Sequence, residues 1–133
     1  MKLSDQERLA WHRLAQSENV GPITFERLLQ RFGSASQALA GVPELSRRGG
    51  LRRPLKLYDE AKALSDFERS EKLGARYIAS CEQDYPDLLR QSPAPPPLIC
   101  VKGRVELLVK PSVASVGARN ASAAGLRFAR MIA

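Results

Sequence analysis

Cysteine and histidine are nearly absent from this chain of 133 residues. Cys81 and Cys100 are the two cysteines, His12 is the single histidine, and none of them has a neighbour at a metal-ligand spacing. A zinc site needs several such ligands, and a cysteine nucleophile needs a histidine base. The sequence therefore predicts neither a metal site nor Cys–His chemistry, and two reduced thiols are typical of a cytosolic protein.

Long apolar runs are absent as well. The start, MKLSDQERLAW, lacks the apolar region of a signal peptide, and no run approaches the ~18 apolar residues of a membrane-spanning helix. The chain also lacks the Gly-Lys-Ser or Gly-Lys-Thr of a P-loop, so ATP hydrolysis by that route is unsupported. We expect a cytoplasmic protein with no membrane segment and no cofactor.

Basic residues are in excess. The chain has 21 Lys and Arg against 14 Asp and Glu, which gives a formal net charge of +7. Such an excess favours a polyanionic partner, because basic side chains release counterions from phosphates. A soluble basic domain that binds no nucleic acid has the same composition, so charge alone leaves both interpretations open.

The first half of the chain has the spacing of amphipathic helices. Ser4 and Glu7 form a capping pattern at the start of a helical stripe over residues 4–17. A second helix is expected between Gly21 and Gly33, where the second glycine ends it.

Three more helices are expected before the pattern changes. Ser34 caps a short one, Pro43 begins another, and helical spacing returns from Lys56 to Leu73. Gly74 ends this last helix.

The pattern after Gly74 mixes strands with helices. Strands are expected over residues 76–79, 98–102 and 112–116, with single helical turns at 84–89 and 105–109 and a longer helix from Ser122. We therefore predict an α + α/β fold, with a helical domain over 1–74 and the start of a parallel-sheet domain over 75–133. One strand–turn–helix cannot close a parallel sheet, so we expect a truncated sequence, with a small complete domain as the alternative.

The stretch SVASVGARNASAAGLRFAR, residues 112–130, is the most informative, because it reads as strand, glycine turn and helix. Helix starts suit phosphates, since they present free amides and the positive end of the helix dipole. Gly117 permits close backbone approach, Arg119 can grip a phosphate, Ser122 can cap the helix or donate to an anion, and Gly125 lets the first turn pack closely. The alternative is a tight turn whose Arg119 only faces solvent.

The order of motifs along the chain resembles the DprA/Smf family of bacterial DNA-processing proteins. The matching pieces are VGPITFERLLQRFGSASQAL, LGARYI, DYPDLL, PPPLICVKG and VASVGARNASAAG. The resemblance implies a sterile-alpha-motif-like helical domain followed by an extended Rossmann-like domain. It also implies a non-enzymatic protein that binds single-stranded DNA, dimerises and helps to load RecA in recombination and natural transformation.

The resemblance further implies which residues bind DNA. Gly117, Arg119, Ser122 and Gly125 match the family's G-[ST]-R-x-x-S-x-x-G turn, in which Arg119 is the principal phosphate contact. Ala118 departs from the family's Ser or Thr and removes one hydroxyl donor. No catalytic residue is carried over.

Two other segments are auxiliary candidates for DNA contacts. VGPITFERLL is similar to half of a helix-hairpin-helix motif, with Gly21 as the contact, although we favour a helix–helix corner of a protein-interaction domain. The loop with Arg47, Arg48, Arg52 and Arg53 either attracts DNA or is simply a solvated loop.

Two rival functions stay open. A nucleotide-phosphate enzyme of a related Rossmann-like fold would use the same glycine turn, but it needs a catalytic carboxylate near the sugar. Glu106 is the nearest acidic residue and precedes the predicted strand, so it is badly placed for that role. The other rival is a protein-interaction fragment whose helical unit binds a partner.

Overall fold

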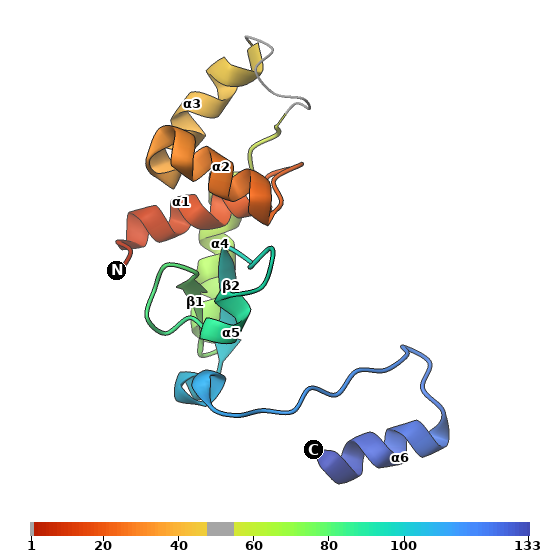
Figure 1. Ribbon diagram of the computed structural model, residues 1–133. Helices are drawn as coiled ribbons and strands as arrows, with labels where there is room; N and C mark the ends of the chain where they lie inside the picture. Colours follow the sequence, from red (N-terminus) through yellow and green to blue (C-terminus); the bar gives the residue numbers. More distant parts are fainter. Residues whose placement is uncertain (1, 48–54) are drawn as a thin grey trace.

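The structure is a computed structural model that describes residues 2–47 and 55–133. Three helices pack at one end, a fourth lies behind a small sheet, and a final helix stands apart from the rest (Figure 1). The elements are α1 (Asp5–Gln16), α2 (Pro22–Phe32), α3 (Ala35–Arg47), α4 (Glu60–Lys72), β1 (Ala75–Ala79), α5 (Asp87–Arg90), β2 (Leu98–Lys102), the 3₁₀ helix η1 (Val105–Val109) and α6 (Ala123–Ile132).

Helix α1 begins where the capping pattern predicts, because the Ser4 side chain accepts a hydrogen bond from the Glu7 amide. The Glu7 carboxylate forms its hydrogen bonds with α3. It accepts from the amides of Ala35 at 2.6 Å and Ser36 at 3.3 Å, and so it satisfies free amides at the start of α3. One carboxylate thus ties α1 to α3.

Helices α2 and α3 meet at a glycine in the left-handed region. Gly33 ends α2 with φ of 86°, and the Ser34 side chain accepts from the Gln37 amide to cap α3, as the sequence predicts. The prediction of a fourth helix from Pro43 is wrong, because Pro43 lies inside α3. Val42, directly before the proline, is fully buried in the core, while Pro43 itself is exposed.

One hydrophobic core joins the helices to the sheet. Trp11 and Phe25 are buried and meet edge to face, with ring centroids 4.9 Å apart. The same cluster includes Leu14 and, from β1, Ala79. The core therefore extends across Gly74, while the domain boundary drawn there stays a prediction.

The two predicted strands at 76–79 and 98–102 are confirmed as β1 and β2. They pair antiparallel, with Tyr77 opposite Cys100, so the described residues do not form the expected parallel sheet. The connection between the strands is fixed by Tyr85, which is fully buried and donates its hydroxyl to the Pro96 carbonyl at 2.8 Å.

The predicted strand at 112–116 is wrong. This stretch is extended but forms no strand, and Val113 and Val116 are 91% and 96% exposed. A strand needs a partner for its main-chain groups, and none lies beside this stretch in the described part of the chain. Helix α6 follows as predicted, and the order of a helical part before a mixed α/β part is confirmed.

Candidate nucleic-acid interface

The segment from Gly117 to Gly125 links the exposed stretch to α6. Ser122 is the N-cap of α6, and its hydroxyl oxygen accepts from the Gly125 amide at 3.2 Å. Ser122 therefore caps the helix, one of the two roles predicted from the sequence. Its hydroxyl proton can still be donated to another acceptor. Helix geometry leaves the first amides of α6 without intrahelical partners, so this end suits an anion.

Arg119 lies three residues before this cap and is exposed. Within residues 2–47 and 55–133 its guanidinium has no ion pair with a carboxylate. Its charge is thus available to an external anion. Phosphate binding by Arg119 stays a prediction.

The two glycines of the segment are open to solvent. A Cβ at Gly117 would meet no atom within 4 Å, and one at Gly125 would meet only Ser122 Oγ at 3.5 Å and Ala121 Cβ at 3.8 Å. Neither glycine has a positive φ. Nothing in the local packing requires a glycine at either place.

The charge of the last 27 residues has one sign. Residues 107–133 contain Lys110, Arg119, Arg127 and Arg130 and no Asp or Glu. More than half of the net charge of +7 therefore lies on this segment. Such a concentration of positive charge attracts polyanions over several ångströms in solution.

The auxiliary candidates lie elsewhere. Gly21 is the exposed N-cap of α2, has no side-chain cap and is followed by Pro22 at the first helical position. Arg47, at the end of α3, forms an exposed ion pair with Glu44. Arg48, Arg52 and Arg53 lie outside the described residues. The structure thus does not bring Gly21 or Arg47 together with α6, which stands apart (Figure 1).

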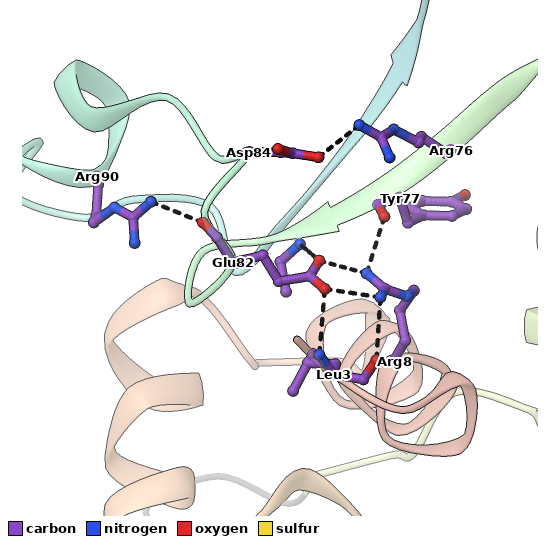
Figure 2. A network of polar contacts seen from close by, with 8 residues as sticks. Leu3, Arg8, Arg76, Tyr77, Glu82, Asp84 and Arg90 are labelled. Atoms are coloured by element: carbon purple, nitrogen blue, oxygen red, sulfur yellow. Dashed lines mark hydrogen bonds and ion pairs between the residues drawn. The ribbon is translucent and has the colours of Figure 1, made fainter. Parts of the chain in front are cut away.

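A buried polar network that the sequence analysis missed holds α1 against β1. Arg8 forms a bidentate ion pair with Glu82, with N–O distances of 2.5 and 2.8 Å, and donates to the Tyr77 carbonyl at 3.1 Å (Figure 2). Glu82 also accepts from the amides of Leu3 and Ala79. Arg8 and Glu82 are 74 residues apart, so no local sequence pattern could have found the pair.

This network changes the ionisation of Glu82. Burial raises the pKa of its carboxyl, but the hydrogen bonds from Arg8, Ala79 and Leu3 lower it more, and the net pKa lies below the ordinary value of 4.5. The same pairing with Glu82 raises the pKa of Arg8. Both groups are therefore charged at neutral pH, and the contact is structural.

His12 is buried in the core. Its Nε2 lies 2.9 Å from Asp66 Oδ2, and the Tyr58 hydroxyl donates to the same oxygen at 3.0 Å. The ring also packs against Phe67 and Tyr77. The hydrogen bond with His12 holds the pKa of Asp66 below its usual value. His12 thus joins α1 to α4 and has no exposed face for chemistry.

The described part of the chain has no group of three or more His, Cys, Asp or Glu side chains arranged to hold a metal ion. Among its helices, none combines the length and the apolar character that crossing a bilayer requires.

Comparisons with known proteins agree over both parts of the chain. Residues 5–68 match the family model described as "DprA-like N-terminal HHH domain", and residues 76–133 match "DNA recombination-mediator protein A". A curated relative, "Protein Smf" from Synechocystis sp., is 27% identical over 140 aligned positions. The alignment covers 98% of this chain and 35% of the relative, so the chain spans about a third of that protein's length.

Proposed function

Because the chain belongs to the DprA/Smf family of DNA-processing proteins, we propose that it binds single-stranded DNA through the sugar-phosphate backbone. The proposal is carried by Arg119, which has no ion pair with a carboxylate in the described part of the chain, together with the capped start of α6. Both lie on a segment without Asp or Glu. The guanidinium supplies a charged, bidentate donor to one phosphate. The first-turn amides of α6 supply neutral donors to the same or the next phosphate.

The proposed preference for single-stranded over duplex DNA is based on the resemblance to the DprA/Smf family. Charge attracts single-stranded and duplex DNA alike. A single strand adapts more readily to a short exposed segment, because its phosphates are not held in a rigid helix.

The same proposal includes a transfer of the bound strand to RecA by a homodimer, in recombination and natural transformation. Support for a protein contact comes from α6, whose Phe128 and Met131 are 60% and 76% exposed. Exposed apolar side chains of this size commonly mark interaction sites. The proposal assigns no catalytic residue.

The test is the salt dependence of binding to a fluorescein-labelled oligothymidine, measured by anisotropy between 50 and 300 mM NaCl, about the range in which phosphate contacts dominate. Arg119→Ala should weaken binding about tenfold at the lowest salt and reduce the slope of log K against log salt by about 0.7, as for one lost phosphate. Arg130→Ala, at the far end of α6, is the matched control and should change affinity less than about threefold.

Two results separate this proposal from its rivals. Equal affinity of the parent and Arg119→Ala would exclude the proposed phosphate contact. Tight binding of a mononucleotide with release of free base would instead identify a nucleotide enzyme. Circular dichroism melts of the variants check that the fold is retained.

A further inference from the structure

A cleft of about 730 Å³ lies along one edge of β1, away from the candidate DNA segment. Its walls come from the start of α1, the end of α4 and the turn after β1, and Lys2, Asp5 and Glu71 line it. Ala75 and Tyr77 of β1 form the side of the cleft that the sheet supplies. The cleft has the volume of a ligand site and is bounded by an open strand edge.

The hydrogen bonds of β1 show which of its amide and carbonyl groups face β2 and which face the cleft. Ser80, directly after β1, donates its amide to the carbonyl of Pro97, directly before β2. The Tyr77 carbonyl instead accepts from Arg8, and the Ala79 amide donates to Glu82. Main-chain groups alternate along an antiparallel strand. The odd-numbered residues of β1 therefore direct their amides and carbonyls away from β2, toward the cleft.

The Arg8–Glu82 network occupies only one end of this edge (Figure 2). The network does not use the amide and carbonyl of Ala75 or the amide of Tyr77. An exposed row of such groups is a template for another strand. Strand addition uses main-chain groups of this kind to bind an extended segment along a sheet edge.

The charges around the cleft argue against DNA as its occupant. Glu82 neutralises Arg8, and Asp84 pairs with Arg76 at 2.7 Å. Asp5, Glu71 and Lys2 have no ion pair within the described ranges of the chain, which leaves one net negative charge in a protein of charge +7. At this place the two carboxylates of Asp5 and Glu71 favour basic side chains over phosphates.

We propose that this cleft binds an extended peptide with basic side chains from a partner protein, added as a strand along Ala75–Tyr77. The main chain of the peptide bonds to the open edge of β1. Its lysine or arginine side chains lie against Asp5 and Glu71. This site is separate from the DNA segment, so the protein can hold a partner and a DNA strand together.

The probe for this proposal is a fluorescein-labelled hexapeptide of alternating valine and lysine, with blocked ends, titrated with the protein in anisotropy measurements. Methylation of alternate amide nitrogens on the peptide edge that faces β1 should weaken binding at least about tenfold, because it removes the main-chain donors. Glu71→Gln should weaken binding about three- to fivefold at low salt. The control Glu68→Gln, on α4 but outside the cleft, should leave it unchanged.

Three outcomes decide between occupants. Equal binding of the methylated and unmodified peptides would overturn strand addition. Shifts of the Ala75 and Tyr77 amide resonances on titration with oligothymidine alone, without the peptide, would also overturn the proposal, since the cleft would then be a nucleic-acid site. The Arg119→Ala variant should bind the peptide as tightly as the parent protein does. This result separates the peptide test from the test of DNA binding.

Discussion

At the scale of single residues, Glu82 and Asp84 provide a direct comparison, because both are carboxylates paired with arginine in one turn. The side chains of the Arg8–Glu82 pair are 14% and 11% exposed, whereas those of Arg76–Asp84 are 56% and 55% exposed. Breaking a buried pair leaves an uncompensated charge away from water, while breaking an exposed pair leaves a solvated one.

Glu82→Gln should therefore lower the free energy of unfolding by about 3 kcal/mol. The matched variant Asp84→Asn should lower it by less than about 1 kcal/mol. Urea unfolding followed by tryptophan fluorescence measures both, since Trp11 lies in the core. Equal losses in the two variants would mean that the buried network contributes nothing beyond a surface ion pair.

Stability should also depend on pH through the same carboxylate. The pKa of Glu82 is lower in the folded protein than its ordinary value of 4.5, so its contribution is complete above about pH 5 and is lost as the pH falls through the folded pKa. Asp66, whose pKa is also lowered, acts in the same direction. The difference in unfolding free energy between the parent and Glu82→Gln should be constant from pH 6 to 8 and shrink below pH 4.5, in urea titrations repeated across that range. A difference that grew on acidification would contradict this assignment.

At the scale of elements, the contact between α2 and α3 depends on a glycine inside a helix. A Cβ at Gly41 would overlap Cε1 of the Phe32 ring and lie 2.9 Å from its Cδ1 and Cζ. Alanine normally stabilises a helix interior by about 1 kcal/mol relative to glycine. Displacing a packed aromatic ring costs about 1–3 kcal/mol, and this term should dominate here.

Gly41→Ala should thus destabilise the protein by about 1 kcal/mol in thermal or urea unfolding. In a Phe32→Leu background the ring is gone, and the same change should be neutral or stabilising. If Gly41→Ala stabilised the parent protein, the ring contact would not govern this position.

Local sequence signals predicted most of the elements. Ser4, Gly33 and Ser122 mark helix ends by chemistry that acts over one turn, and all three act as predicted. Apolar runs bounded by turn residues likewise located β1 and β2. These features need no knowledge of the remaining chain.

The wrong or missed features depend on the rest of the chain. Pro43 suggested a helix start, but α3 continues through it, and Val42 directly before it packs in the core. Residues 112–116 have strand composition, yet a strand forms only beside a partner. The Arg8–Glu82 pair joins segments that only the fold brings together. For the candidate site, the motif placed Arg119 before the cap of α6, while phosphate binding itself requires a measurement.

At the scale of the whole molecule, charge and packing are unevenly distributed. The buried core lies in α1–α4 and the sheet, whereas residues 111–133 are exposed throughout and carry three arginines without a carboxylate. The cleft beside β1 has the opposite local charge. This separation is consistent with the two proposals, in which residues 117–125 bind DNA and the cleft beside β1 binds a partner peptide.

The most direct measurement is an NMR titration of the ¹⁵N-labelled protein with oligothymidine, followed through backbone amide shifts. The largest changes should fall on residues 117–125, saturate with a single affinity and disappear in Arg119→Ala. Saturating changes confined to α1–α4, with residues 117–125 unmoved, would contradict DNA binding at this segment.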